Sequence, residues 1–402
     1  MYLNVKTNRS GLDRRTRILE EGDIVNDRRV DTPINPPIYL STAFCVDTLD
    51  ELRDLYNEKG YSYIRTRNPN RNMLAEMVSY LEGGEESLTF SSGMAAITTA
   101  ITANLEQGDH ILADDTLYGE AMTFIQKVLP SYGVQVSMVD FTDLETVRAS
   151  IRPNTKVVYS EVVANPTIKV IDVAAVAEIA HTAGAKFIID NTFTTSFVIQ
   201  PLKLGADIVV NSLTKFANGH SDVCAGAVTS DTENIALVHA RQLLVGSILD
   251  PFSAYLCQRG MRTMDVRLER QCKNAAALAE ALEASPYVEK VLYPGLKSHP
   301  QKEAADKQFK GAYGAMLSFY MPEDWPAINQ FMHQLRVPHY AMTLGGYRTS
   351  LSYPIMSTHP GQTKEERDAI GITEGMMRVS VGMEDTQDLV NDFLQALTVF
   401  NR

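Results

Sequence analysis

The chain has the length and composition of an ordinary globular protein: 402 residues, 45% of them hydrophobic and 21% charged, enough for two or three domains. The net charge of −12 without any basic block argues against nucleic acid as a partner. No apolar run approaches a membrane span and the first residues lack a signal-peptide core, so we expect a cytoplasmic protein with no membrane partner.

The four cysteines, Cys45, Cys224, Cys257 and Cys272, show neither metal-ligand spacing nor a CxxC pair. We expect them to be reduced thiols that act mainly as small core residues, and we expect no metal site.

Residues 1–61 are predicted to be an irregular arm. The segment 31–38 contains three prolines and cannot form a helix. A segment too polar to build its own core is expected to lie over another surface, and we predict contact with a neighbouring subunit. A free tail is the alternative.

Residues 62–255 alternate short β-rich runs with helical patterns. Near-continuous apolar strands separated by helices predict a large α/β domain with a mostly parallel central sheet covered by helices on both faces. Ligands bind at the carboxyl ends of the strands in such sheets. The expected strands are Ser87–Phe90, His110–Ala113, Val134–Val139, Thr155–Ser160, Lys186–Asp190 and Ile208–Asn211, and the expected helices are Met94–Asn104, Tyr118–Leu129, Leu144–Ile151 and Val173–Ala183.

Residues 256–402 are predicted to form a smaller α+β domain. A long helix is expected over Met261–Ala284 because charged and apolar residues alternate there at helical spacing. Beyond Pro294 the elements are fewer: we expect strands at Met316–Met321 and Met377–Val381, and helices at Trp325–Leu335 and Thr386–Phe400.

Lys215 and Asp190 mark the predicted site. Lys215 follows the apolar run 206–210 and has Ser212 and Thr214 beside it, while Asp190 ends another apolar run. Lysine and aspartate are rarely buried unless they are paired or have a task. This combination suits a pyridoxal phosphate (PLP) site, in which the lysine forms an imine with the cofactor aldehyde, the hydroxyls hold its phosphate, and the acid keeps its ring nitrogen protonated.

Three further positions fit such a site. The segment 91–94 joins a strand to a helix, and Gly93 lets the backbone approach a phosphate. Tyr118 stands at a strand-to-helix turn, where it can stack on a flat ring or serve as an acid or base; a core tyrosine is the alternative. Arg378, in an apolar strand, would bind a substrate carboxylate or form an internal salt bridge.

From about Pro33 to its end, the chain resembles the transsulfuration family of PLP enzymes, in particular methionine γ-lyase and cystathionine γ-lyase. The resemblance implies the aspartate-aminotransferase-like fold called fold type I. The segments that carry it, in chain order, are 36–42, 63–65, 68–69, 91–94, 190–193, 212–215, 218–222, 344–346 and 378–385.

The resemblance implies a role for each site residue. Lys215 and Tyr118 would be catalytic, and the tyrosine would also stack on the ring. The cofactor would further be held by Gly93, Met94, Asp190, Ser212 and Thr214, with Tyr63 and Arg65 reaching in from a neighbouring subunit. The amino-acid substrate would contact Arg378, Thr343, Asn165, Glu120 and Met342. The family usually forms a homotetramer built as a dimer of dimers.

Four positions bear on the choice of substrate. Thr123 and Met342 stand where cystathionine-handling relatives often have arginine and glutamate, which favours a substrate whose far end lacks a carboxylate, such as methionine or homocysteine. Glu120 stands where methionine γ-lyases often have cysteine, and Arg348 replaces an acid usual in the family. Glu120 would select a cationic substrate such as canavanine, or is a solvated acid at a helix start.

The predicted reaction is PLP-dependent γ-elimination, which yields a 2-oxo acid and ammonia. Three alternatives stay open: cystathionine γ-lyase activity, γ-replacement as in cystathionine γ-synthase or an O-acylhomoserine sulfhydrylase, and a non-catalytic PLP-binding relative. A dinucleotide-binding protein is disfavoured because the first strand lacks a Gly-x-Gly-x-x-Gly turn.

Overall fold

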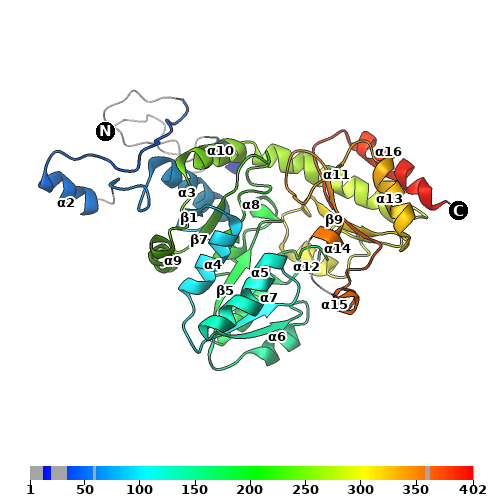
Figure 1. Ribbon diagram of the computed structural model, residues 1–402, viewed down its shortest axis with the longest axis horizontal. Helices are drawn as coiled ribbons and strands as arrows, with labels where there is room; N and C mark the ends of the chain where they lie inside the picture. The colour runs from blue at the N-terminus through cyan, green and yellow to red at the C-terminus, as the bar shows by residue number, and fades with distance from the viewer. Residues whose placement is uncertain (1–11, 20–33, 58–59, 358–362, 402) are drawn as a thin grey trace.

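Two β-sheets organise the chain in the computed structural model, which describes residues 12–19, 34–57, 60–357 and 363–401 (Figure 1). The larger sheet has seven strands in the order β1-β7-β6-β5-β4-β2-β3. Its strands are β1 (Glu86–Phe90), β2 (His110–Asp114), β3 (Gln135–Val139), β4 (Thr155–Glu161), β5 (Lys186–Asp190), β6 (Ile208–Asn211) and β7 (Gly226–Ser230).

The larger sheet is mostly parallel, as the sequence predicted. Strands β6, β5, β4, β2 and β3 pair in parallel, whereas β7 pairs antiparallel with both β1 and β6. Strand β7 was not predicted. It contains glycine, alanine and serine among only two β-branched residues, so its composition gives little strand signal.

Helices cover both faces of this sheet. Phe187 and Ile189 of β5 pack in one core cluster with α3 (Pro69–Glu82) and α7 (Val173–Thr182). Ile188, between them, packs in a second cluster with α4 (Gly93–Ala103), α5 (Gly119–Thr123) and α9 (Thr232–Val245). This alternation leaves both faces apolar and explains the nearly unbroken hydrophobic strands in the sequence.

The smaller sheet has five strands in the order β10-β11-β12-β9-β8. A third core cluster fills the space between this sheet and its helices. The elements are β8 (Lys290–Leu292), β9 (Met316–Tyr320), β10 (His339–Tyr340), β11 (Ser350–Ser352), β12 (Met376–Ser380), α11 (Met264–Glu283), α13 (Trp325–Gln334) and α16 (Thr386–Leu397). The predicted domain boundaries, 1–61, 62–255 and 256–402, stay predictions.

Two helix predictions were wrong in their extent. The helix expected over Met261–Ala284 is α11, but it begins at Met264 and not at Met261, because the Thr263 backbone is not helical; a separate helix that was not predicted, α10 (Pro251–Met261), comes before it. The helix expected over Tyr118–Leu129 is α5 followed by a π-helical turn and a 3₁₀ turn that reaches Tyr132. Pro130 lies in that last turn and lacks the N–H that a continuing α-helix needs.

The described part of the predicted N-terminal arm divides into two pieces. Arg14 in α1 (Arg14–Arg17) donates two hydrogen bonds of 3.2 Å to the Asp265 carboxylate, and Ile18 is buried in the core, so residues 12–19 pack on their own chain. The segment around Pro37 and Tyr39 is held on the start of α3 by hydrogen bonds with Asn68 and Asn70. Residues 40–57, which include α2 (Leu49–Asn57), extend away from the body (Figure 1). The rest of the arm lies outside the described residues.

The remaining short helical elements connect these layers: η3 (Pro201–Leu204), α6 (Leu144–Ser150), α8 (Thr195–Val198), α12 (Lys302–Gln308), α14 (Pro354–Ser357), α15 (Lys364–Ala369) and η4 (Thr398–Phe400). Among the helices that the structure describes, none is both long enough and apolar enough to span a membrane.

Candidate active site

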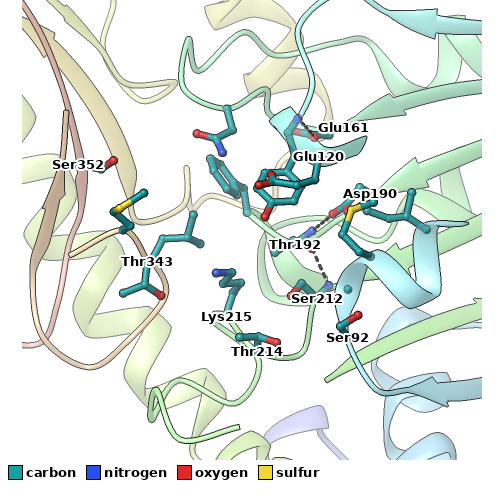
Figure 2. A pocket seen from close by; sticks show the side chains of 18 of the residues that line it. Ser92, Glu120, Glu161, Asp190, Thr192, Ser212, Thr214, Lys215, Thr343 and Ser352 are labelled. Carbon is teal, nitrogen blue, oxygen red and sulfur yellow. Dashed lines mark hydrogen bonds between the residues drawn. The ribbon is translucent and has the colours of Figure 1, made fainter. Parts of the chain in front are cut away.

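A cavity of about 290 Å³ lies between the two sheets, at the carboxyl ends of β4, β5 and β6 (Figure 2). Ligands of open α/β sheets bind at this edge. The structure brings twelve of the fourteen predicted site residues to its wall: Gly93, Met94, Tyr118, Glu120, Asn165, Asp190, Ser212, Thr214, Lys215, Met342, Thr343 and Arg378.

Lys215 reaches the cavity from the turn that follows β6, and its amine points into the open space in Figure 2. Burial, together with the positive charge of Arg378, lowers the pKa of the Lys215 amine. A lysine with a lowered pKa is more often neutral and is therefore a better nucleophile toward an aldehyde.

The turn from β1 into α4 forms a cradle opposite Lys215. The Ser92 hydroxyl accepts from the Ala95 N–H at 3.0 Å and caps α4. The N–H groups of Gly93 and Met94 are the first two of α4 and are available to an anion. A Cβ on Gly93 would lie 2.7 Å from Cβ of Ser212, so only glycine lets the cradle and the Ser212 turn meet. The cradle suits a phosphate.

Asp190, at the end of β5, is fixed by the loop that follows it. Its carboxylate accepts from the Thr192 N–H at 2.8 Å, and the Thr192 hydroxyl accepts from the Ser212 N–H at 2.7 Å (Figure 2). Burial raises the pKa of Asp190 to about 6, against the lowering effect of the hydrogen bonds from Thr192. Thr192 thus links Asp190 to Ser212, the residue whose hydroxyl is predicted to bind the phosphate.

Tyr118 stands immediately before α5, and its ring lines the cavity. Its backbone N–H donates to the Glu161 carboxylate at 2.6 Å (Figure 2). Burial and the neighbouring Glu120 carboxylate raise the pKa of the Tyr118 phenol well above its usual value. The phenol therefore keeps its proton and can donate it or a hydrogen bond.

Arg378 projects into the cavity from β12, next to Ser352 of β11 in the small sheet. Its Nη1 donates to the Asn165 side-chain oxygen at 2.8 Å, and its Nη2 donates to the Thr343 carbonyl at 3.2 Å. Its buried Nε has no hydrogen-bond partner in the described part of the chain. Burial lowers the pKa of the guanidinium to about 10. Such a cation invites a carboxylate.

Tyr63 and Arg65 are the two predicted site residues outside the cavity wall. Both are exposed on the segment that follows α2, and the Arg65 guanidinium lies 5.3 Å from the centre of the Tyr63 ring. Their predicted place in a neighbouring subunit's site stays a prediction.

Several residues of the cavity wall were not predicted. Glu161 ends β4 one residue beyond the expected strand, so the same strand-end signal that marked Asp190 could have found it. Ser352 and Ser357, from β11 and α14, carry no motif, and only the fold brings them to the cavity. Cys224, expected to be a core residue, is exposed and also lines the cavity.

Together these groups fit PLP. The cavity holds a lysine of lowered pKa, an acid at the end of the neighbouring strand, a glycine-lined helix start with two hydroxyls, and an aromatic ring. Each matches one part of that cofactor: aldehyde, ring nitrogen, phosphate and ring face. The fold and the site define a PLP-dependent enzyme of the α/β class.

Comparison with known proteins identifies the family. The chain belongs to the family described as Cys/Met metabolism PLP-dependent enzyme, whose profile matches residues 18–398. This confirms the resemblance to transsulfuration enzymes and excludes a dinucleotide-binding protein. The cofactor is therefore PLP, and the chain is a PLP-dependent enzyme of a family of carbon–sulfur lyases.

Individual relatives include both lyases and synthases. The chain is 41% identical to L-methionine gamma-lyase of Fusobacterium nucleatum subsp. polymorphum, over 90% of this chain and 92% of that one. It is 40% identical to cystathionine gamma-lyase of Sus scrofa, over 90% and 89%. Its fold matches the structure of cystathionine gamma synthase from Xanthomonas oryzae pv. oryzae with a TM-score of 0.91, at 33% identity over 96% and 98%. These names leave the reaction of this chain open.

Proposed function

We propose that the protein is a PLP-dependent γ-lyase that acts on an amino acid resembling methionine or homocysteine and releases a 2-oxo acid and ammonia. The observation that carries this proposal is the position of Arg378. Its buried guanidinium shares the cavity with Lys215 and forms no ion pair with a carboxylate in the described part of the chain. An α-carboxylate bound there would place the α-carbon of the substrate near Lys215.

The residues that would hold PLP follow from the geometry. The N–H groups of Gly93 and Met94, with the side chains of Ser212 and Thr214, would bind the phosphate. Asp190 would pair with the ring nitrogen. When bound, PLP supplies an electron sink for bond cleavage at the substrate's α-carbon.

Two residues are suited to move protons. The Lys215 amine, with its lowered pKa, can take a proton from the α-carbon and return it elsewhere on the substrate. The Tyr118 phenol, with its raised pKa, can donate a proton to the group that leaves the γ-carbon. The Glu161 carboxylate fixes the backbone of Tyr118 and so orients this donor.

The cavity wall supports a substrate with only one carboxylate. Among the described residues that line the cavity, only Lys215 and Arg378 carry a positive charge, and both already have roles. A second carboxylate, as in cystathionine, would meet Glu120 and Met342 instead. γ-Replacement would need a second substrate in the same space, and γ-elimination requires only water to enter.

The test is a substrate panel with purified protein: methionine, homocysteine, cystathionine, O-acetylhomoserine with sulfide, and canavanine. Oxo acid, ammonia and thiol are measured. We expect a visible absorbance band of bound PLP that borohydride bleaches, its loss in Lys215→Ala, and the highest kcat/KM for a substrate with a single carboxylate. Cystathionine as the best substrate, or net replacement with acylhomoserine, would contradict the proposal.

A second candidate is γ-elimination from a cationic amino acid such as canavanine, and Glu120 is the observation that favours it. Its carboxylate lines the cavity beside the Tyr118 phenol, and its negative charge also acts on Lys215 (Figure 2). A guanidinium at the far end of a substrate would pair with this carboxylate.

Glu120→Gln tests this candidate because it removes the charge and keeps the shape. We expect kcat/KM for canavanine to fall roughly 10- to 100-fold, the worth of one charge-assisted hydrogen bond, while the value for methionine changes little. Equal losses on both substrates would show that Glu120 acts through Tyr118 and does not select the substrate. Glu145→Gln, an exposed acid of α6, is the matched control.

We also propose that the active unit is an oligomer. The segment 40–57 projects from the body with Leu40, Leu49 and Tyr56 exposed by 73%, 84% and 65%. Apolar side chains this exposed on a projecting segment indicate a partner surface. A second copy of the chain is the partner that would bring Tyr63 and Arg65 to a cavity.

A further inference from the structure

Glu82 is a buried acid that the proposed chemistry does not use. It is the last residue of α3, is 3% exposed, and lies behind the cavity wall without lining it. Burial raises the pKa of its carboxyl to about 7. A carboxylate at a helix C-terminus is also opposed by the helix dipole. Burial and the helix dipole both disfavour a carboxylate here, which indicates that the Glu82 side chain has a structural or functional role.

The partners of Glu82 lie at the ends of two neighbouring strands. Its Oε2 accepts from the side-chain amide of Asn191 at 3.0 Å, and its Oε1 accepts from that of Asn211 at 3.0 Å. Asn191 follows β5, and Asn211 is the last residue of β6. In the described part of the chain no cation forms an ion pair with Glu82, so these two amides are its direct partners.

Both asparagines are next to residues of the cavity wall. Asn191 stands between Asp190 and Thr192, and Asn211 directly precedes Ser212. The Thr192 hydroxyl in turn accepts from the Ser212 N–H, which closes a ring of contacts from one strand end to the other. A shift of the Glu82 carboxylate would therefore move the ring-nitrogen acid and the phosphate turn relative to each other.

We infer that Glu82 is a positioning residue for the cofactor: its carboxylate, by accepting from both Asn191 and Asn211, sets the spacing between Asp190 and the Ser212–Lys215 turn. The inference rests on the proposed roles of Asp190 and Ser212 toward PLP. The two amides are donors on both sides, so the position needs an acceptor at each end. The two oxygens of Glu82 supply both, and they do so fully above about pH 7, where the carboxyl is ionised.

Glu82→Gln is the direct test. Glutamine has one acceptor and one donor end, so one of the two asparagines must either face a second amide or turn its own amide over, and both outcomes disturb the strand end that it belongs to. We expect the Kd for PLP, measured by titrating the cofactor-free variant, to rise roughly tenfold or more, the visible band to shift or weaken, and kcat to fall. Glu85→Gln, with the same charge change on an acid that binds Thr232, should leave all three unchanged.

A compensating variant separates positioning from simple stability. In Glu82→Gln/Asn211→Asp, the glutamine oxygen accepts from Asn191 and its amide donates to the new carboxylate, so both contacts return. We expect PLP affinity and the visible band to recover toward wild-type values. Asn211→Ala, which removes one contact only, should raise the Kd for PLP without removing the near-ultraviolet circular dichroism of the folded protein.

The results distinguish this inference from the proposed function. A wild-type protein without a visible PLP band would overturn the assigned site as a whole. A normal wild-type band, with Glu82→Gln changing only the melting temperature and leaving the Kd, the band and kcat within twofold, would overturn the role of Glu82 alone. A double variant no better than Glu82→Gln would overturn it too.

Discussion

Arg378 combines a buried positive charge with a guanidinium nitrogen that has no hydrogen-bond partner in the described part of the chain. Two of its nitrogens are held by Asn165 and Thr343, so the guanidinium is fixed before any ligand arrives, and its remaining capacity is directed at the cavity. Lysine carries the same charge but cannot present two parallel donors. We expect Arg378→Lys to raise KM about 10- to 100-fold, which corresponds to the loss of one charge-assisted hydrogen bond.

Steady-state kinetics together with PLP titration check this expectation. Because Arg378 is proposed to bind substrate and not cofactor, the Kd for PLP should stay within about twofold of the wild-type value. A variant that loses PLP while its KM is unchanged would place Arg378 in the cofactor site instead.

Glu82 also predicts a pH effect on stability. The pKa of its carboxyl is about 7 in the folded protein, raised from an ordinary value of 4.5 mainly by burial. Asn191 and Asn211 oppose this shift through hydrogen bonds, and Arg14 and Lys310 oppose it through their charges. The folded state then holds a proton that the unfolded state has released, so the contribution of Glu82 to stability falls as pH rises from about 4.5 to about 7.

Replacing Glu82 by glutamine removes this dependence. Between pH 5.5 and pH 8, the cofactor-free wild-type protein should lose about 2 kcal/mol more unfolding free energy than Glu82→Gln does, at equal protein concentration. Urea denaturation at the two pH values measures the difference. Parallel pH profiles for the two proteins would contradict the raised pKa.

At the scale of elements, the turn 344–346 packs the small sheet against the turn that carries Lys215. Gly345 has a φ of 80°, and its N–H donates to the Ser380 hydroxyl at 2.8 Å. A Cβ added there would lie 2.4 Å from the backbone nitrogen of Phe216, the residue after Lys215. Backbone atoms cannot yield as a flexible side chain can, so the two turns would have to separate.

Gly345→Ala should therefore lower activity by more than a strained backbone conformation alone would. A positive φ costs alanine about 1 kcal/mol, and a displacement of about 1 Å at Lys215 is expected to lower kcat/KM roughly 10- to 100-fold. Gly246→Ala is the matched control, because Gly246 has a φ of 74° at the end of α9 but nothing within 4 Å of the added Cβ. Equal kinetic effects in both variants would refute the packing argument.

Elements and site were predictable from sequence to different degrees. Parallel strands such as Lys186–Asp190 are buried on both faces, so their apolar runs reveal them, and the polar residue that ends each run marks the edge where the cavity lies. Strand β7 was not predicted because it lies between β1 and β6, where small residues fill the available space and give little strand signal. The start of α11 was placed at Met261 where the structure has Met264, because the apolar spacing continues from α10 through Thr263.

The support behind the site could not be predicted in the same way. Glu82 ends an amphipathic helix, a position where an acid usually meets solvent, and its two partners are 109 and 129 residues away in sequence. Only the packing of α3 against the strands makes it a buried acceptor. The same holds for Glu161, whose contact with Tyr118 spans 43 residues. Residues that line the cavity lie in short sequence motifs that can be recognised. Residues that hold those motifs in place, such as Glu82 and Glu161, can be recognised only once the fold is known.

At the scale of the whole molecule, one chain provides an incomplete version of the predicted site. Lys215 lines the cavity, but Arg65, predicted to bind the cofactor phosphate, is exposed outside it. A symmetric dimer in which each segment 63–65 enters the other subunit's cavity would complete both sites. Each site would then need Lys215 from one subunit and Arg65 from its partner.

Hybrid dimers test this directly. Lys215→Ala and Arg65→Ala should each be nearly inactive alone, but a dimer containing one of each has one site with both residues intact. When the two variants are co-expressed in equal amounts, half of the dimers are hybrids with one working site, so activity should recover to about a quarter of the wild-type value. If Lys215 and Arg65 acted within the same chain, no hybrid site would be intact and the mixture would stay as inactive as its components.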